Sequence, residues 1–185
     1  MTCDAIVNAA ARVLSTEGID RCSTNRIAEV AGVSIGSVYE YFENKQAIID
    51  AVALRHLDRI SSMFDNAIVV LGDNADLQTV VRVLVEAVIA AHGHDVRLHR
   101  SLSQEVPLSE HVLRKAEEFK HRTVLSIQRL LGDHLGTSDL SAQIVFDSVD
   151  SIVHRWARDC EHKPVPRERL SAELIRLLEG YLTYR

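Results

Sequence analysis

Apolar residues recur at intervals of three and four along nearly the whole chain, and this spacing constrains the fold more than any other feature. The first such segment contains Ile6, Ala9, Ala10, Val13 and Leu14. These positions share one face of an α-helix. Later segments repeat the pattern, and no segment alternates with period two for long enough to build a sheet. The sequence therefore predicts an all-α protein.

Capping residues and breaks divide this pattern into about nine helices. Ser23, Ser34 and Asn44 stand where N-caps are expected, and Gly18 and Gly32 stand where helices end. Three short helices come first, followed by longer ones of the kind that form a bundle. The expected helices span residues 5–16, 24–30, 35–42, 45–71, 77–92, 96–105, 109–134, 139–160 and 167–184.

The composition is that of a globular protein with a mildly acidic balance. The 185 residues are 46% hydrophobic, and 21 basic side chains stand against 26 acidic ones, for a net charge of −5. These proportions exclude a disordered, collagenous or disulfide-stapled chain. A protein that binds nucleic acid usually presents a basic surface, so the net charge on its own weighs against that function.

The chain carries no sign of export or membrane insertion. No apolar run is long enough to cross a bilayer, and the N-terminus lacks a basic segment followed by an apolar core. Cys3, Cys22 and Cys160 are odd in number and have no CxxC spacing, as expected of reduced thiols. We therefore expect a cytoplasmic protein that does not engage a membrane.

The segment from Thr24 to Lys45, TNRIAEVAGVSIGSVYEYFENK, has the spacing of a helix-turn-helix unit. Such a unit needs a small residue where its two helices cross, which Ala28 supplies. It also needs a turn residue that tolerates positive φ, which Gly32 supplies. The apolar side chains expected to face a supporting helix are Ile27, Ala31, Val33, Val38 and Tyr41.

Residues 5–52 resemble the DNA-binding domain of the tetracycline-repressor (TetR) family of transcriptional regulators. The resemblance rests on the first helix AIVNAAARVLSTEG, the STNRIAEVAGVS unit, the recognition helix SIGSVYEYF and the NKQAI start of the next helix. It implies a three-helix DNA-binding domain at residues 1–52 and a helical ligand-binding and dimerisation domain at residues 53–185. It further implies a homodimer that binds a palindromic operator in double-stranded DNA.

The helix that follows Ser34 is the expected recognition helix, with its N-terminal half in the major groove. Ile35 would contact a thymine methyl group, and Ser37 would donate to or accept from a base edge. Gly36 has no side chain and lets the backbone approach the phosphates. The remaining expected DNA contacts, several of them to phosphates, are Ser23, Thr24, Asn25, Arg26, Tyr39, Tyr41 and Lys45.

Some of these side chains have a structural role as their alternative. Ser23 and Ser34 could act only as caps, Tyr41 could pack inward, and Phe42 is expected in the core rather than at the DNA. Residues 1–50 contain four basic and seven acidic side chains, so few cations are available to displace counterions. We expect modest non-specific affinity and a shallow dependence of binding on salt.

Two helices near the C-terminus have apolar sectors wide enough for burial on two sides, one of them against a partner subunit. The expected dimer residues are Ile152, Trp156, Leu170, Leu174, Leu177, Leu178 and Tyr181. An effector pocket is expected between residues 60 and 156, where aromatic residues are few, which favours a small apolar effector of unknown identity. Its expected lining is Met63, Leu84, Val88, Leu102, Phe119, Phe146, Asp150 and His154. Ordinary core packing is the alternative for the apolar members of both sets.

The polar residues of this half allow two interpretations. Asp150 and His154 lie one helical turn apart and can pair with each other, either as a polar handle in the pocket or as a surface or interface pair. His92, His94 and His99 are close in sequence, but the last two are five residues apart across a helix boundary, unlike the i, i+4 pair of a helical metal site. We expect a solvated loop there, with no metal and no cofactor.

These observations predict a ligand-responsive transcriptional repressor that leaves its operator when a small-molecule effector binds. The alternative is a constitutive or protein-controlled DNA-binding module without a small-molecule ligand. An enzyme built on a helical bundle is a remote alternative, because the sequence has no HExxH, no Glu-x-x-His repeated on two helices and no Gly-rich phosphate loop. We expect no catalytic activity.

Overall fold

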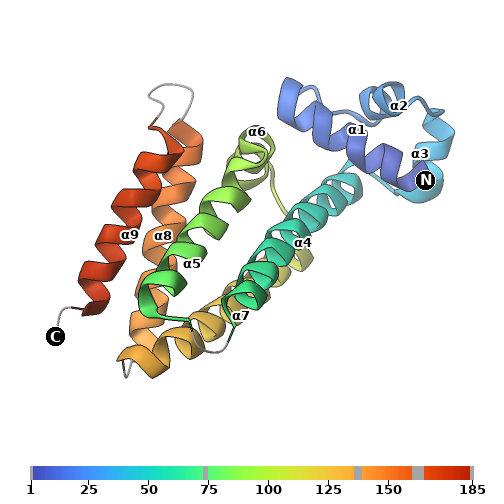
Figure 1. Cartoon of the computed structure of the whole chain (residues 1–185). Coiled ribbons are helices and arrows are strands. Elements are labelled where there is room, and N and C mark those ends of the chain that lie inside the picture. Colours follow the sequence, from blue (N-terminus) through green and yellow to red (C-terminus); the bar gives the residue numbers. More distant parts are fainter. Residues whose placement is uncertain (1, 73–74, 136–138, 160–164, 184–185) are drawn as a thin grey trace. The chain divides into compact units, whose positions relative to one another are not determined.

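The computed structural model describes residues 2–72, 75–135, 139–159 and 165–183. Within these ranges the chain forms nine α-helices and one π-helical segment, without a strand, which confirms the all-α fold (Figure 1). Cys160 and Tyr184 lie outside the described residues. The elements are α1 (Thr2–Glu17), α2 (Thr24–Ala31), α3 (Ile35–Tyr41), α4 (Lys45–Leu71), α5 (Leu77–Gly93), α6 (Val96–Arg100), η1 (Ser101–Glu105), α7 (Glu110–Leu135), α8 (Asp139–Asp159) and α9 (Arg167–Thr183).

The chain divides into two compact units. The first contains Met1–Asp58 and Asp95–Ala116, and the second contains Arg59–His94 and Glu117–Arg185. Helices α4 and α7 contribute to both units, because the division falls inside each of them. The boundary expected between residues 52 and 53 also lies inside α4. No helix in the described ranges is both long and apolar enough to cross a membrane.

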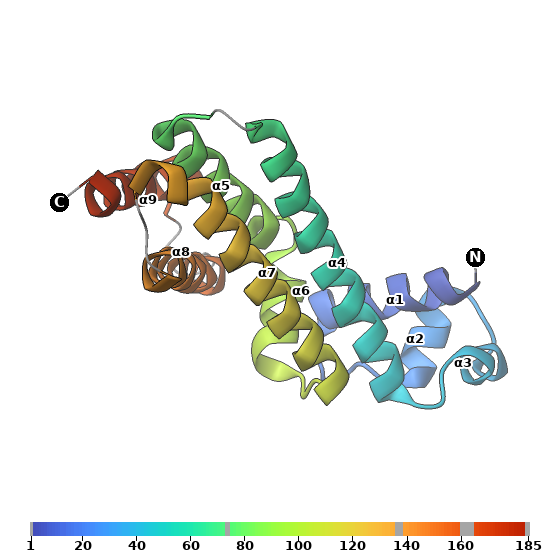
Figure 2. The same cartoon turned by 90° about the horizontal axis from the view of Figure 1, so that it is seen from below.

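The first unit is built on α1, which packs against α2, α3 and α6. Helices α1, α2 and α3 form a close group (Figure 2). The predicted stripe on α1 is buried as expected, because it faces the other helices of this unit. The most deeply buried side chains of the first unit include Ile6, Val13, Leu14, Ile27, Val38 and Ile48.

The second unit is built on α5, which packs against α8 and α9. The three helices lie side by side in Figure 1. Helix α5 is apolar on most of its circumference, with nine buried residues, as expected of a helix covered on more than one side. Core side chains of this unit include Val85, Ile89, Leu131, Ala142 and Val153.

The single helix expected at residues 96–105 is instead two elements, α6 and the π-helical turn η1. The Ser103 hydroxyl donates to the carbonyls of His99 and Arg100, at 2.8 and 3.3 Å. Serine hydroxyls that bind backbone carbonyls in this way compete with the regular helical ladder. The turn ends at Val106, which is extended because it precedes Pro107 and the proline ring disfavours the helical conformation there.

Candidate nucleic-acid interface

Helices α2 and α3 are joined by the tight turn that the sequence predicts. Gly32 follows α2 with φ +70°, in the left-handed region that glycine adopts without strain. The amide of the next residue, Val33, donates to the carbonyl of Ala28 at 3.1 Å, which closes the C-terminus of α2. The turn fixes the direction in which α3 leaves α2, so the helix-turn-helix geometry follows from these local interactions.

Serine residues begin both helices of this unit. The Ser23 side chain accepts a hydrogen bond from the Arg26 amide at 3.2 Å, and the Ser34 side chain accepts one from the Ser37 amide at 3.0 Å. Their predicted role as N-caps is confirmed.

Ser34 also stands in the pentapeptide GVSIG, which matches the G-x-S-x-G of hydrolase nucleophile elbows. That motif needs a strand before the serine, whereas α2 precedes Ser34 here.

Helix α3 presents an exposed face and is anchored through one buried residue, Val38. Ile35, Tyr39 and Tyr41 are all exposed, and Tyr41 keeps 52% of its surface accessible. The alternative in which Tyr41 packs inward is therefore wrong. Phe42 is partly buried against the core, as expected. The face of α3 that carries the predicted DNA contacts is thus a surface.

The hydroxyl of Tyr39 lies 3.3 Å from Thr24 Oγ1 at the start of α2. This hydrogen bond joins the exposed face of α3 to the N-terminus of the preceding helix. Two of the predicted contact residues, from different helices, are therefore adjacent on one surface. A phosphate at this place would meet both hydroxyls together with the first turn of α2.

Arg26 is occupied within the protein rather than extended from it. Its guanidinium donates to Glu17 Oε1 from two nitrogens, at 3.1 and 2.7 Å, and another nitrogen lies 2.8 Å from Glu29 Oε2. These hydrogen bonds raise the pKa of Arg26 and lower the pKa of Glu17. The sequence pattern had marked Arg26 as a DNA contact and had not marked Glu17, which lies nine residues earlier on α1.

Lys45 also has a partner within the first unit. Its Nζ donates to the Ile19 carbonyl at 3.1 Å, while the Asn44 side chain accepts from the Ala47 amide at 2.9 Å and caps α4. An ammonium carries three donors, so a phosphate contact remains compatible with this bond. The remaining predicted contact residues at this edge, Asn25 and Gly36, are exposed.

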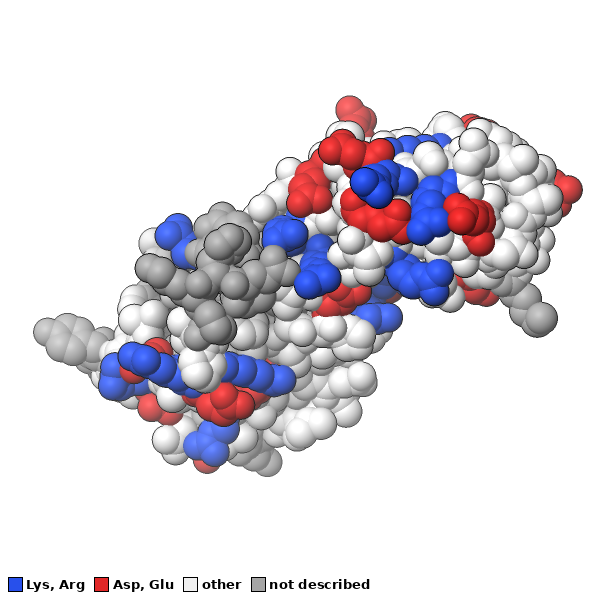
Figure 3. Space-filling model, turned by 90° about the horizontal axis from the view of Figure 1, so that it is seen from above, with Lys and Arg blue, Asp and Glu red and all other residues white. Residues whose placement is uncertain are grey.

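Basic and acidic side chains are mixed on the face of the molecule drawn in Figure 3. On the face drawn in Figure 3, basic and acidic side chains alternate over short distances. This distribution agrees with the net charge of −5. This face therefore offers no broad positive surface to a DNA duplex.

The second unit gathers most of the predicted effector residues in its core. Leu84 and Val88 are buried on α5, and Met63, Phe119 and Phe146 are partly buried against the same cluster. The rings of Phe64 and Phe119 meet edge to face with centroids 5.9 Å apart. Leu102 is the exception, because η1 places it in the core of the first unit.

The predicted solvated loop around His92 and His99 is wrong. His92 lies on the last turn of α5 and is only 4% exposed, because α5 continues to Gly93. His99 is buried on α6, where its Nδ1 lies 3.0 Å from Nε2 of His56. His94 Nδ1 lies 3.0 Å from Nη1 of Arg59. Each of these histidines therefore has a defined protein partner.

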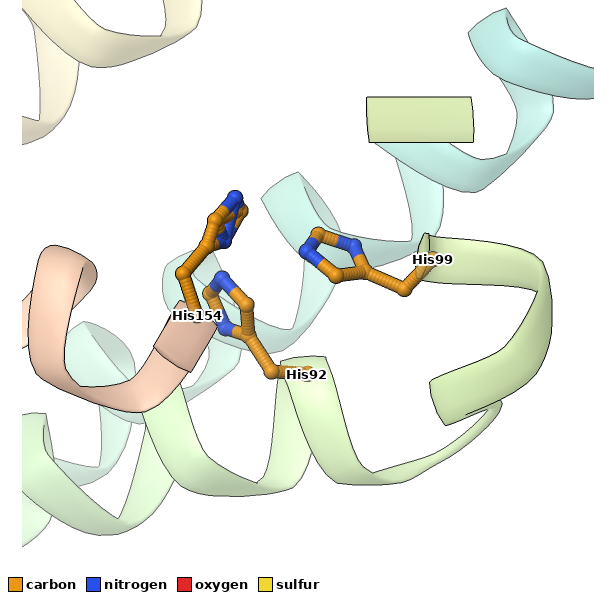
Figure 4. A group of neighbouring side chains, drawn as sticks. All are labelled: His92, His99 and His154. Carbon is orange, nitrogen blue, oxygen red and sulfur yellow. The ribbon is translucent and has the colours of Figure 1, made fainter. Parts of the chain in front are cut away.

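His92 is a neighbour of the predicted polar pair on α8. Its Nε2 lies 3.5 Å from Asp150 Oδ1, and its ring meets the ring of His154 edge to face, with centroids 4.7 Å apart (Figure 4). Asp150 and His154 are half-buried. The packing of α5 on α8 thus brings together three groups that are distant in sequence.

The predicted dimer residues differ in their exposure: three are exposed, three are buried and Trp156 is intermediate. Ile152, Leu177 and Tyr181 are exposed, and Leu177 keeps 52% of its surface accessible. Leu170, Leu174 and Leu178 instead fill the core of the second unit, because residues four apart on α9 form the face that packs toward α5. Trp156 is half-buried and donates through Nε1 to the Val165 carbonyl at 2.8 Å. Leu140 and Ile144 of α8 are also exposed.

A helix-turn-helix unit with an exposed recognition helix, carried together with a separate helical unit, defines a DNA-binding transcriptional regulator. Residues 6–52 match the family model described as bacterial regulatory proteins of the tetR family, and residues 76–182 match the tetracyclin repressor-like C-terminal domain. The chain belongs to the TetR family of transcriptional regulators.

Individual relatives are similar to different extents. An uncharacterized HTH-type regulator of Bacillus subtilis, YvdT, is 34% identical over 87 residues, which are 45% of this chain and 41% of YvdT. The repressor KstR2 of Rhodococcus jostii is 22% identical over 83% of this chain and 78% of its own length. The structure of FadR from Bacillus subtilis with stearoyl-CoA shares the fold, with a TM-score of 0.71, 19% identity and 97% of each chain covered.

Proposed function

We propose that this chain is a ligand-responsive repressor, which binds a palindromic operator as a homodimer and leaves it when an apolar effector binds the second unit. The observation that carries the proposal is the exposed face of α3, held in place by the Gly32 turn and the caps Ser23 and Ser34. A helix exposed in this way can enter the major groove of a duplex, where its polar side chains meet base edges and its apolar ones meet thymine methyl groups.

The proposed DNA contacts follow the exposed surface. Ile35 would meet a thymine methyl group and Ser37 a base edge, while the Tyr39 and Thr24 hydroxyls bind a phosphate. Ser23, Ser34, Asn25, Gly36, Tyr41 and Lys45 complete the set. Arg26 supports this surface by fastening α2 to α1 through Glu17.

One relative supports the repressor function, and another supports the response to a ligand. KstR2 carries the name of a transcriptional repressor, and FadR from Bacillus subtilis was solved with stearoyl-CoA. The second unit of the present chain offers an apolar helical core with few aromatic rings, which suits an acyl chain better than a flat aromatic compound. We therefore propose an effector with an extended apolar part.

Fluorescence anisotropy on labelled fragments from the promoter of the chain's own gene tests the DNA-binding part. We expect saturable binding by the dimer at low salt. The variant Ile35→Ala should weaken binding to the best fragment by roughly 10-fold, because one apolar base contact is lost. The matched control Val69→Ala removes an exposed apolar side chain in the second unit and should leave binding unchanged. Equal losses in both variants would contradict the assignment of α3.

A thermal-shift screen tests the effector part, with stearoyl-CoA, free stearate and coenzyme A as separate probes. Binding to the folded state raises the melting temperature, and we expect the two acyl compounds to do so and to dissociate the DNA complex. A chain that binds DNA but responds to no compound of a metabolite panel would favour the constitutive or protein-controlled module instead.

A further inference from the structure

Two serine hydroxyls lie against each other at the start of α3, within the first unit. Ser34 Oγ and Ser37 Oγ are 2.9 Å apart, and the same Ser34 oxygen accepts the Ser37 amide hydrogen at 3.0 Å. A hydroxyl has one proton to donate and two lone pairs that accept. The direction of this hydrogen bond therefore decides whether Ser37 presents a proton or lone pairs to a group outside the helix.

The amide of Ser37 decides this direction. The amide nitrogen and Oγ belong to one residue and reach Ser34 Oγ from the same side. A Ser34 proton aimed at Ser37 Oγ would lie beside the amide hydrogen that already points at Ser34 Oγ, and the two hydrogens would repel each other. When Ser37 donates instead, both of its hydrogens point at lone pairs of Ser34 Oγ. Ser37 is thus the donor within the pair, and its outward lone pairs act as acceptors.

The pair belongs to the exposed face of α3. Ser34 is exposed and Ser37 is half-buried, whereas the adjacent Val38 is fully buried. Gly36 has no side chain that could cover the pair, and a Cβ at Gly36 would lie 3.6 Å from Ser34 Oγ. The acceptor of Ser37 is therefore presented on the same surface as the exposed side chain of Ile35.

From this geometry we propose that Ser37 determines specificity by accepting a hydrogen bond from an exocyclic amino group in the major groove, with Ser34 as the residue that fixes its polarity. The inference rests on the proposed function, in which α3 enters the groove of an operator. In the major groove adenine N6 and cytosine N4 donate, whereas guanine O6 and thymine O4 accept. Ser37 therefore favours adenine or cytosine at the base that it faces. A phosphate offers only acceptors and is not its partner.

Selection from double-stranded DNA with a randomised central segment tests this polarity. The full-length parent chain and Ser37→Ala each select duplexes, and sequencing shows the position at which their preferences differ. Fluorescence anisotropy at one salt concentration then compares the four base pairs at that position, changed in both half-sites. We expect the parent chain to bind adenine or cytosine at least about 5-fold more tightly than guanine or thymine, and Ser37→Ala to discriminate by less than about 2-fold.

The variant Ser34→Ala tests whether the neighbouring hydroxyl sets the polarity. It keeps the Ser37 hydroxyl but removes the acceptor of its proton, which can then turn outward toward guanine or thymine. We expect discrimination to fall below about 2-fold although Ser37 is present. The matched control Ser23→Ala removes the corresponding cap of α2, whose oxygen accepts from the Arg26 amide at 3.2 Å. It should lower the affinity for all four duplexes by the same factor and keep the discrimination of the parent chain.

Three results would each overturn a different part of this assignment. A folded parent chain that selects no DNA sequence would overturn the proposed function, and the role of Ser37 with it. A parent chain that selects an operator would overturn the role of Ser37 alone if Ser37→Ala has the same preferences, or if guanine or thymine is preferred at the position that differs. Unchanged discrimination in Ser34→Ala would overturn the role of Ser34. Circular dichroism of each variant checks its fold.

Discussion

The guanidinium of Arg26 lies between the carboxylates of Glu17 and Glu29. The fork geometry binds Glu17 through two nitrogens, so we expect Arg26 to act as a clamp between α1 and α2 rather than as a free cation for DNA. The polarity of a residue in a DNA-binding motif does not by itself make it a DNA contact. At Arg26 the interaction is with the protein's own first helix.

A double-mutant cycle on Arg26 and Glu17 separates these roles. If the pair is a clamp, Arg26→Ala and Glu17→Ala lower the melting temperature and weaken operator binding by similar factors, and the double variant is no worse than either. A phosphate contact by Arg26 would show differently: Arg26→Ala alone would lose more affinity, and the salt slope of binding would fall by about 1. We expect the first pattern, measured by anisotropy at several salt concentrations.

Cys22 is a fully buried thiol whose pKa is raised above its usual value, mainly by burial. The thiolate is the reactive form, so Cys22 should be inert in the native chain at neutral pH. In a Cys3→Ser, Cys160→Ser variant, we expect a thiol reagent to label Cys22 at least about 100-fold more slowly than in denaturant, through rare opening of the unit. Rapid labelling of the folded variant would contradict the burial of this side chain.

At the scale of the elements, the turn between α2 and α3 depends on the backbone of Gly32. A Cβ there meets no atom within 4 Å, so a substitution is strained only by φ at +70°. Gly32→Ala should destabilise the chain by about 1 kcal/mol and weaken DNA binding. Gly180 lies within α9, also without a close neighbour. The matched control Gly180→Ala should instead stabilise by about 0.5–1 kcal/mol in chemical denaturation.

Helices α5 and α9 are joined by Glu86, whose carboxylate accepts from the Ser171 hydroxyl and from Arg167 at 2.9 Å. These hydrogen bonds lower the pKa of Glu86 from its ordinary value of 4.5, with Ser171 as the larger cause. A carboxyl with a lowered folded-state pKa stabilises the protein above its unfolded-state pKa. That contribution is lost as pH falls through the folded-state value.

Glu86→Gln should therefore cost up to about 1 kcal/mol near neutral pH, since the side chain is half exposed and solvent screens the pair. The difference between parent and variant should shrink as pH is lowered below about 4.5. Urea denaturation at several pH values measures both quantities. A difference that stays constant with pH would show that the carboxylate charge contributes nothing to stability.

At the scale of the whole molecule, the exposed apolar side chains of α8 and α9 bear on the proposed dimer. Ile152, Leu177 and Tyr181 are accessible on the second unit. A second copy packed on this surface would remove its apolar side chains from water. The resulting dimer would present two recognition helices to one palindromic operator. We expect Leu177→Glu to weaken dimerisation at least about 10-fold, because a charge would enter the interface, and operator binding should fall with it.

Analytical ultracentrifugation over a concentration series measures this equilibrium. The control Val69→Glu introduces the same charge at an exposed apolar residue of α4 and should leave the dimer intact. If Leu177→Glu sediments as the parent chain does, the interface lies elsewhere on the molecule.

The sequence by itself determined most of the helices, the turn at Gly32 and the caps at Ser23 and Ser34. These features depend on interactions between residues no more than five positions apart, such as the Val33 amide with the Ala28 carbonyl. Spacing and residue type are sufficient to predict them, because a helix and its ends are local structures. The helix-turn-helix, and with it the position of the proposed DNA-binding surface, could therefore be predicted before the structure.

Only the tertiary structure decided which side chains meet across helices. It placed Glu17 against Arg26, Leu102 in the first unit, and Asp150 and His154 against His92. The apolar stripe of α9 predicted burial but did not show whether its partner was α5 or a second subunit. A helical repeat specifies which face is apolar and leaves the partner open, because helix packing depends on contacts between residues far apart in the chain.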